Sequence, residues 1–491
     1  MRAFKRFLAV IAAAVLALGA VACKSELEKL ASGLTDYVIT AEYDAAAHTV
    51  KAHQRVDYIN NYEVELNELR FNMYGNAYRR DAKYKPVEED AREDAYPNGE
   101  SWGAMSVSGV KLGGAVLGYK LGGADKTALI IALPSPLYPT ERIGLEFDFT
   151  LKLAEVNHRT GYSDKTVNLG NWDPIAAVYE NGGFVCDPYY SNGDPFYSEP
   201  ANYDVTLTAP SGYTAASSGQ SVGTDISGGK KTVKLTARVV RDFAIVLSPS
   251  FKVMSRETAG TAVIYYYYDD NDAEASLQAA VDALTTFNKL FGKYPYSTYS
   301  IAQTTFIQGG MEYPNLVLIS DRYAGEQYCE IIIHETAHQW WYGVVGNNEV
   351  AHAWMDEGLT AYSTTVFYEF NPQYNISKTD RILKSIQNYY IYSDIYSAVK
   401  GELDTSMNRP VNGFLSAYEY FYMVYVKGEL MLDSLRGTIG DKAFFDGMRK
   451  YYADNKYKTV RPEDFIGAME AASGKDMGGI FKAWLEGDVI N

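Results

Sequence analysis

The hydrophobic pattern of this chain changes its period near residue 255, and this change limits the folds open to it. Before that point, short runs alternate apolar and polar residues; in TVKAHQRVDYIN (49–60), Val50, Gln54 and Val56 share one side. Such alternation is typical of half-buried β-strands. After it, apolar residues recur at helical spacing, as Leu277 and Val281 do. The sequence therefore predicts an antiparallel β domain followed by an α+β domain.

Similar alternating runs extend the first domain, which we expect to span 36–255. A strand at 261–268 and a helix capped by Asp272 open the second domain, 256–491, which is mostly helical from about 325. A chain of 491 residues is long enough for two or three domains. The other alternating runs are 69–75, 142–153, 202–210, 230–240 and 242–253.

The charge balance removes one class of partner. The formal net charge is −16, and the sequence contains no basic tract. Because phosphate binding needs clustered Lys and Arg, we do not expect a nucleic acid partner. A hydrophobic content of 47% with 22% charged residues is ordinary for a folded globular protein.

The N-terminus is typical of an export signal. Arg2, Lys5 and Arg6 precede an uncharged apolar run, 7–22, which is too short for a comfortable membrane span. The run ends in GAVAC, which resembles a bacterial lipoprotein box with Cys23 as the lipidated residue. We expect a signal peptide at 1–22, a lipidated Cys23 and tether at 23–35, and a lipid-anchored protein at the bacterial cell surface or on the periplasmic side. Cleavage after residue 22 without lipidation would instead give a secreted protein.

The segment IIIHETAHQWW (331–341) contains two of the six histidines of the chain. On a helix, which we expect to end at Gly343 or Gly346, residues four apart lie one turn above each other. His334 and His338 can then hold one metal ion, and Glu335, about 100° round the helix, can reach a water beside it. The alternative is a pair of buried histidines bonded to backbone carbonyls.

A catalytic zinc site needs a third protein ligand and one open position. Glu357, in WMDEGLTAY (354–362), follows His338 by 19 residues and lies in an apolar stretch. Alone, it would be interpreted as a solvated carboxylate at a helix start, next to Asp356. Beside the two histidines, it becomes the candidate third ligand.

These motifs together resemble a known family. H-E-x-x-H, eighteen residues and a Glu are similar to the M1 (gluzincin) zinc metallopeptidases, and HETAHQWWYGVVGNNEVAHAWMDEGLTAYS (334–363) resembles their zinc-site signature throughout. GGMEYPN (309–315) resembles the G-x-M-E-N exopeptidase motif, and VYVKGELML (424–432) resembles the Tyr-x-Lys-Gly segment. GDPFYSEPANYDVTLTAP (193–210) resembles a stretch of the family's β domain, so the likeness covers about 36–491.

The resemblance implies a saddle-like N-terminal β domain and an α+β thermolysin-like zinc metallopeptidase domain. It implies an aminopeptidase that acts on peptides with a free N-terminus by metal-activated water, with Zn²⁺ as cofactor. The implied zinc ligands are His334, His338 and Glu357. Glu335 would be the general base, and Tyr425 would donate a hydrogen bond to the oxyanion.

The resemblance also implies how the substrate is held. Glu312 would bind the α-ammonium group by charge-assisted hydrogen bonds. Its motif also contains Gly309, Gly310 and Met311, and we expect the two glycines to admit the substrate backbone closely.

The sequence departs from the family pattern in several places. Tyr313 stands where Asn is usual, and His352 stands where an acidic residue is common. We did not find a clear equivalent of the β-domain Glu or Gln that helps bind the amine; Glu180 and Asp187 are loose candidates. Cys186 and Cys329 can either pair or remain free thiols. The likeness ends with the catalytic domain, so we expect a short form without the long C-terminal helical domain and with an open cleft.

Two other functions stay open from sequence. One is a thermolysin-like endopeptidase, which would cut N-acetylated peptides that an aminopeptidase cuts poorly. The other is a non-catalytic peptide-binding surface lipoprotein, against which the intact Glu335 argues.

Overall fold

A computed structural model describes residues 26–487, so the predicted signal peptide (1–22) and Cys23 lie outside the described residues. Within the predicted tether, Glu26–Ala31 forms a short helix, α2. None of the helices in the described range 26–487 combines the length and the apolar character that a membrane span requires.

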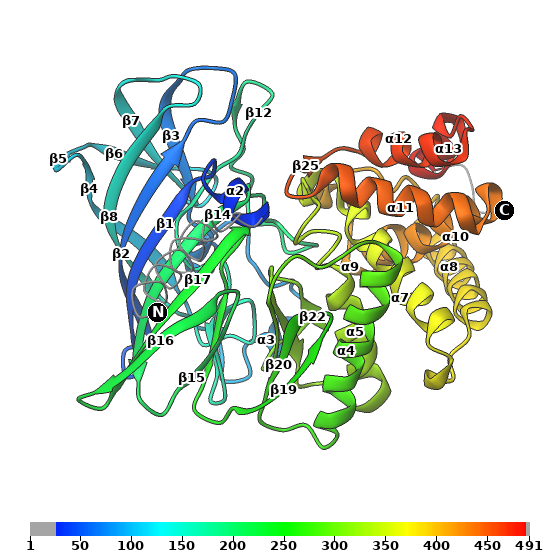
Figure 1. Cartoon of the computed structure of the whole chain (residues 1–491), viewed down its shortest axis with the longest axis horizontal. Coiled ribbons are helices and arrows are strands. Elements are labelled where there is room, and N and C mark those ends of the chain that lie inside the picture. The colour runs from blue at the N-terminus through cyan, green and yellow to red at the C-terminus, as the bar shows by residue number, and fades with distance from the viewer. Residues whose placement is uncertain (1–25, 488–491) are drawn as a thin grey trace, which may run out of the picture.

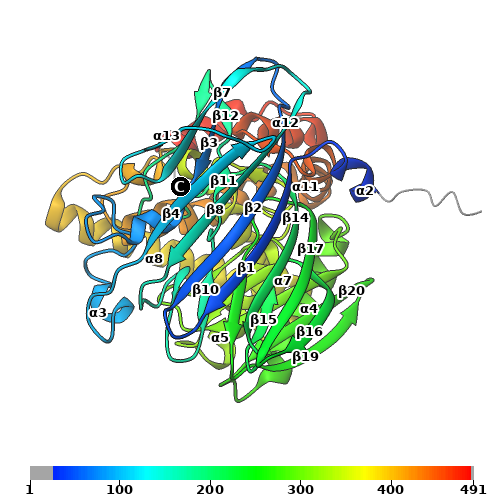
Figure 2. The ribbon, with the colours of Figure 1, turned by 90° about the vertical axis from the view of Figure 1, so that its left-hand side faces the viewer.

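The first domain is built on a broad curved sheet of eight strands, seen face-on in Figure 2. All neighbours in it are antiparallel except β1 and β14, which run parallel. In sheet order the strands are β16 (Gln220–Ser227), β17 (Lys230–Val240), β14 (Ala201–Pro210), β1 (Asp36–Asp44), β2 (Thr49–Ile59), β8 (Arg142–Lys152), β4 (Ala104–Leu112) and β5 (Ala115–Val116).

The predicted alternation along β2 is confirmed, because every second side chain from Val50 onward is buried. Gln54 is the polar member of this face, and its amide Nε2 donates a hydrogen bond to the carbonyl oxygen of Pro174 at 2.7 Å. A buried amide is tolerated when it finds such a partner, which explains a Gln in a core position.

Smaller sheets complete this domain. A short helix, α3 (Arg92–Ala95), and a 3₁₀ turn at Tyr74–Tyr78 lie between its strands. The first four-stranded sheet contains, in order, β15 (Thr214–Ser217), β18 (Ile245–Ser248), β10 (Val167–Leu169) and β9 (Thr160–Tyr162). The second contains β11 (Ile175–Ala176), β3 (Leu66–Asn72), β7 (Ala128–Leu137) and β6 (Tyr119–Gly122). A separate hairpin joins β12 (Tyr179–Glu180) and β13 (Gly183–Phe184).

The predicted strand at 242–253 is wrong, because it is two strands in different sheets. β18 ends at Ser248 in the β domain, and β19 begins at Lys252 in the second domain. Pro249 lies between them, and a proline cannot donate a hydrogen bond to a strand ladder. β19 therefore spans the predicted domain boundary at 255, which stays a prediction.

The second domain begins with a five-stranded sheet. β20, β21 and β23 are parallel, and the two-residue β22 pairs antiparallel with β23 at the sheet edge. The predicted cap of the first helix, α4 (Ala273–Leu290), is confirmed, since the Asp272 side chain accepts from the Ala275 amide. The strands are β19 (Lys252–Thr258), β20 (Thr261–Tyr267), β21 (Thr298–Thr304), β23 (Leu316–Ser320) and β22 (Gly310–Met311).

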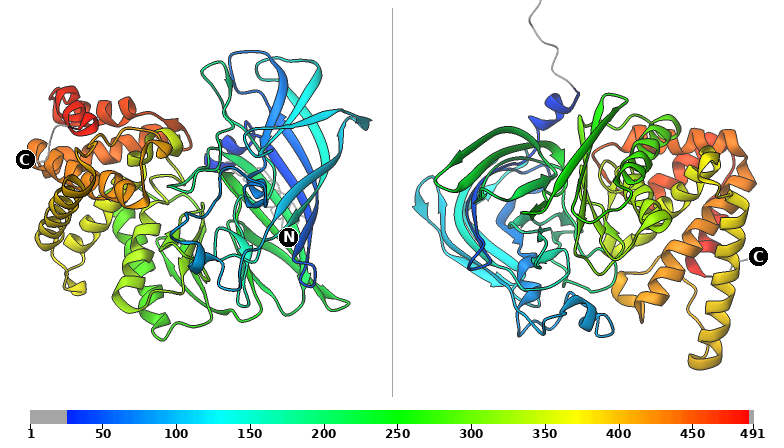
Figure 3. Two further views of the ribbon diagram at one scale, coloured as in Figure 1. Left: turned by 180° about the vertical axis from the view of Figure 1, so that it is seen from behind. Right: turned by 90° about the horizontal axis from the view of Figure 1, so that it is seen from below.

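Helices fill the rest of this domain and gather on the side away from the β domain (Figures 1 and 3). A π-helix, Phe421–Val426, connects α9 to α10, and β24 (Gly346–Asn347) pairs with β25 (Thr459–Val460). The helices are α5 (Gly325–Ala337), α6 (Glu349–His352), α7 (Glu357–Phe370), α8 (Lys378–Lys400), α9 (Ala417–Tyr420), α10 (Lys427–Ile439), α11 (Asp441–Asn455), α12 (Pro462–Ser473) and α13 (Gly478–Glu486).

The helix predicted to carry both histidines ends earlier than predicted, at Ala337 rather than at Gly343 or Gly346, so His338 is its C-cap. Beyond it the chain forms turns, and Tyr342 adopts a φ of 140°, which no helix allows. The Gly343 amide donates to the carbonyl of His338 at 2.9 Å, which closes this turn. Burial of Trp340 and Trp341 in the core holds the turn in place.

Candidate metal centre

Three predicted ligands converge where α5 ends and α7 begins. His334 lies in the last turn of α5, His338 follows its end, and Glu357 is the first residue of α7. The Nε2 atoms of the two histidines are 3.3 Å apart, and the Oε2 atom of Glu357 lies 3.2 Å from His334 Nε2 and 3.1 Å from His338 Nε2. The end of one helix and the start of another thus bring one carboxylate and two imidazoles together.

These separations fit a tetrahedral metal ion. Ligand bonds of about 2.0–2.1 Å at tetrahedral angles place the donor atoms about 3.3 Å apart. Burial alone would raise the pKa of Glu357, but His338 and His334 hold it well below its usual range, so the carboxylate is ionised. Two imidazole nitrogens and a carboxylate oxygen form a donor set suited to zinc.

The turn after α5 orients the second imidazole. Nδ1 of His338 lies 3.1 Å from the carbonyl oxygen of Trp341, to which an Nδ1–H group donates. This tautomer leaves the Nε2 lone pair directed at the other two donors. The early end of α5 is what makes this contact possible, because a continuing helix would keep the Trp341 carbonyl away from His338.

Glu335 lies beside the three ligands and is only 5% exposed. Its carboxylate, that of Glu312 and the His338 imidazole each place an atom within 4.8 Å of the others. Burial, followed by the charge of Glu312, raises its pKa well above the ordinary value. A carboxylate in this position is suited to accept and return a proton.

Gly310 lies directly against Glu335. A Cβ atom there would sit 2.5 Å from Cδ and 2.6 Å from Cγ of Glu335, closer than side-chain atoms approach. At Gly309 the nearest atom would be Ile331 Cδ1 at 3.4 Å, an ordinary contact. The structure therefore gives Gly310 a packing reason that the sequence did not reveal. The predicted role of both glycines in admitting substrate stays a prediction.

Glu312 follows the edge strand β22, which also contains Met311, and is 3% exposed. Within residues 26–487 its Oε1 atom has no hydrogen-bond partner. Burial, and next the charge of Asp194, raise its pKa to about 8. The buried carboxylates of Asp194, Glu312 and Glu357 each place an oxygen within 4.8 Å of the others.

Asp194 is a β-domain carboxylate at this centre that the sequence interpretation did not single out. Its Oδ1 atom accepts a hydrogen bond from Arg159 at 2.5 Å, and both side chains are buried. Glu180 pairs with Arg461 at 2.7 Å, and neither Glu180 nor Asp187 joins the clusters of possible ligands among the described residues. The available signal was the likeness of the segment GDPFYSEP, which begins one residue before Asp194.

Tyr425 is held at the centre by the π-helix Phe421–Val426. Its hydroxyl donates a hydrogen bond to Oε1 of Glu357, and its ring stacks on His334 with centroids 5.9 Å apart. Burial, and then the charge of Glu357, raise its pKa well above the ordinary value, so the hydroxyl keeps its proton. Short π-helices are frequent at functional sites, because the extra residue redirects side chains.

The departures from the family pattern have structural partners. The Tyr313 hydroxyl donates to Oδ1 of Asn171 at 2.7 Å, in a space that Gly170 leaves open. His352 contacts Asn408, with 2.8 Å between Nδ1 and Oδ1, and is absent from the ligand clusters within 26–487.

The Gln339 side chain links the segment that contains Glu312 to the turn after α5. Its Oε1 atom accepts a hydrogen bond from the backbone N–H of Asn315 at 2.8 Å, and its Nε2 atom donates to the carbonyl oxygen of Tyr313 at 3.3 Å.

The two cysteines within the described residues do not pair: Cys186 and Cys329 are free thiols.

Comparison with known proteins agrees with this geometry. Residues 275–484 match the model of the peptidase family M1 domain. Aminopeptidase N of Streptomyces lividans is 25% identical over 316 residues, which cover 59% of this chain and 36% of that protein. Aminopeptidase B of Rattus norvegicus is 25% identical over 370 residues, which cover 69% of this chain and 52% of that protein. The chain spans about a third of the length of the first curated relatives that it matches.

Among solved structures, the M1 zinc metallopeptidase of Deinococcus radiodurans superposes with a TM-score of 0.65 at 17% identity, covering 93% of this chain and 94% of that one. At this identity the likeness concerns the fold, and it confirms the predicted order of a β domain followed by a metallopeptidase domain. The family-model match at residues 275–484 and the shared two-domain fold together support an M1 metallopeptidase.

Proposed function

We propose that this chain is a zinc-dependent aminopeptidase that removes N-terminal residues from peptides. The observation that carries the proposal is the convergence of His334, His338 and Glu357 beside two further buried carboxylates, Glu312 and Asp194. Curated relatives named aminopeptidase N and aminopeptidase B support the same activity. A solved relative of the same fold is described as bound to a Tyr-Ser-Ala substrate.

The reaction needs a general base and a stabiliser of negative charge. A zinc ion held by the three ligands would polarise the scissile carbonyl and lower the pKa of water. Glu335 takes a proton from the attacking water and gives it to the departing amine, so that its carboxylate ends the cycle ionised. The Tyr425 hydroxyl turns from Glu357 to the oxyanion as negative charge develops there, a contact worth roughly 2.7–4 kcal/mol in comparable sites.

The substrate amine explains why so many carboxylates are buried here. Glu312 has an unpartnered oxygen among the described residues, and in the same range Asp194 forms its ion pair with Arg159. Leaving carboxylates desolvated and unpaired costs free energy. An α-ammonium group offers three donors to these oxygens and repays that cost. An internal peptide segment has no such cation, so the site favours an aminopeptidase over an endopeptidase.

The test is a panel of aminoacyl p-nitroanilides and their N-acetylated counterparts, assayed with and without a zinc chelator. We expect hydrolysis of the free-amine substrates only, and its loss with the chelator. Glu312→Gln should lower kcat/KM for free-amine substrates by at least about tenfold, since a charge-assisted contact is lost. Glu326→Gln, an exposed change in the first turn of α5, is the matched control. Equal cleavage of blocked and free substrates would refute the assignment.

We also propose export and anchoring through Cys23, supported by the basic start, the apolar run 7–22 and the GAVAC sequence. The full chain, expressed in a bacterium, should partition into the detergent phase after membrane extraction. Cys23→Ser should move it to the aqueous phase. Aqueous partitioning of the unaltered chain would refute lipidation and leave simple secretion.

A further inference from the structure

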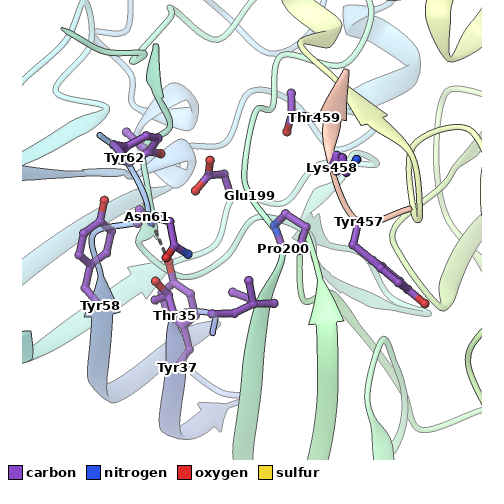
Figure 4. A pocket seen from close by; sticks show the side chains of 14 residues that line it. Thr35, Tyr37, Tyr58, Asn61, Tyr62, Glu199, Pro200, Tyr457, Lys458 and Thr459 are labelled. Atoms are coloured by element: carbon purple, nitrogen blue, oxygen red, sulfur yellow. Dashed lines mark hydrogen bonds between the residues drawn. The ribbon is translucent and has the colours of Figure 1, made fainter. Parts of the chain in front are cut away.

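A cavity of about 300 Å³ lies between the β domain and the segment that leads into β25. Tyr37, Tyr58 and Tyr62 line it from the β domain, and Tyr457 lines it from the opposite side. Figure 4 shows Glu199 on the same side as the three β-domain tyrosines, whereas the Tyr457 ring points away from it. The cavity shares no residue with the metal centre, so the mechanism above leaves it unexplained.

Glu199 places an accessible carboxylate inside an aromatic surround. Its side chain is exposed to solvent, yet enough protein surrounds it that burial raises its pKa. The neighbouring Tyr62 hydroxyl favours the ionised form of Glu199 and so lowers its pKa in part. After burial, the charge of Glu199 is the main influence that raises the pKa of both Tyr58 and Tyr62, which shows how closely the rings surround it.

The tyrosines are held in fixed positions. The hydroxyl oxygen of Tyr37 accepts from the Ala176 amide at 2.9 Å, and that of Tyr62 accepts from the Tyr179 amide at 2.9 Å. These bonds come from different strands, so the walls of the cavity are rigid before any ligand arrives. Preformed walls lower the cost of binding.

No cationic side chain in the described part of the chain forms an ion pair with Glu199. Lys458 lines the cavity, but its Nζ atom donates to the Asp454 carbonyl at 2.6 Å and points away from Glu199 in Figure 4. The nearby Arg241 directs its N–H groups to the carbonyls of Tyr342, Ser198 and Lys458 and to a threonine hydroxyl. The charge of Arg241 lowers the pKa of Glu199 in part, but none of these N–H groups donates to the carboxylate, so Glu199 has no ion-pair partner among residues 26–487.

We propose that this cavity binds a small organic ammonium ion, with Glu199 as the counter-charge and the tyrosine rings as its walls. Aromatic rings attract cations, and tyrosine hydroxyls can accept from an ammonium group. A volume of this size admits a ligand such as a primary or quaternary alkylammonium ion and fits the lower range of small-molecule sites. An anion is excluded, because it would meet the Glu199 carboxylate.

The test is calorimetric titration of the full chain with ethanolamine and with choline at constant ionic strength, and with acetate as the anionic comparison. Saturable binding of at least one ammonium probe is expected, with none for acetate. Glu199→Gln should weaken that binding by roughly tenfold or more, since it removes the charge. Asp225→Asn, which removes one exposed carboxylate on β16, is the matched control and should leave binding unchanged.

Two further variants keep the test decisive. Glu312→Gln should retain the binding, which separates the cavity from the proposed amine site at the metal centre. Tyr58→Phe keeps the ring, and should bind within a few fold of the unaltered chain if the ring face is what the cation meets. No saturable binding by either probe, equal binding by Glu199→Gln and Asp225→Asn, or loss in Glu312→Gln would overturn the proposal.

Discussion

Replacing Gly310 with Ala tests how the general base is positioned. The new Cβ atom would lie 2.5 Å from Cδ of Glu335, whereas ordinary contact begins at 3.4 Å. Pairing with Ile319 on β23 fixes the strand that carries Gly310, and α5 fixes the backbone of Glu335. The carboxylate must therefore move by about 1 Å, a displacement that costs on the order of 100-fold in rate when it affects a catalytic group.

The assay is kcat on an aminoacyl p-nitroanilide, with zinc content and thermal unfolding measured on the same samples. We expect Gly310→Ala to fold, to keep its zinc and to lose about 100-fold in kcat. Gly309→Ala is the matched control, because its Cβ would meet only Ile331 at ordinary contact distance, so its kcat should stay within a few fold of the unaltered chain. Equal losses in the two variants would refute the reasoning and favour the earlier view that both glycines serve substrate approach.

Three other variants test separate parts of the account. Glu335→Gln should keep zinc but lose about 10²–10⁴-fold in kcat, and full turnover would discard its role as the base. Tyr425→Phe should lower kcat by about 10²–10³-fold with little change in KM; a change confined to KM would contradict the oxyanion role. Asp173 is buried without hydrogen-bond partners for its carboxylate among the described residues, and burial, followed by Asp242, raises its pKa from 3.8 to about 8. The folded chain holds a proton there that the unfolded chain releases, so this group's contribution to stability falls by about 1.4 kcal/mol per pH unit between those values. Asp173→Asn should remove that slope in urea unfolding at pH 5 and pH 8, and an unchanged slope would refute the assignment.

The sequence was sufficient to predict the structural features that local residue spacing controls. The period of two gave β2 with its buried Gln54, and the polar residue before an apolar helical run gave the cap at Asp272. The spacing of four between His334 and His338 placed both rings on one side of the chain, and Glu357 met them as expected. These features depend on neighbours in sequence or on a strong motif.

The features that the sequence did not predict depend on packing between residues that are distant in the sequence. The end of α5 at Ala337 follows from burying Trp340 and Trp341, and no residue between Ala337 and Gly343 is a helix breaker. Asp194 lies in the loop before β14 and forms an ion pair with Arg159, which directly precedes β9, so its position depends on a contact between segments 35 residues apart. The closeness of Gly310 to Glu335 likewise depends on how the sheet edge meets α5.

The central claim is that three side chains hold one metal ion. Its most direct test is the metal content per chain, measured by mass spectrometry after dialysis, for the purified full chain and its variants. The account predicts about one zinc per chain, strongly reduced in His338→Ala and in Glu357→Ala and unchanged in His352→Ala, whose imidazole contacts Asn408 instead. A chain without stoichiometric transition metal, or one that retains its zinc in Glu357→Ala, would contradict the claim.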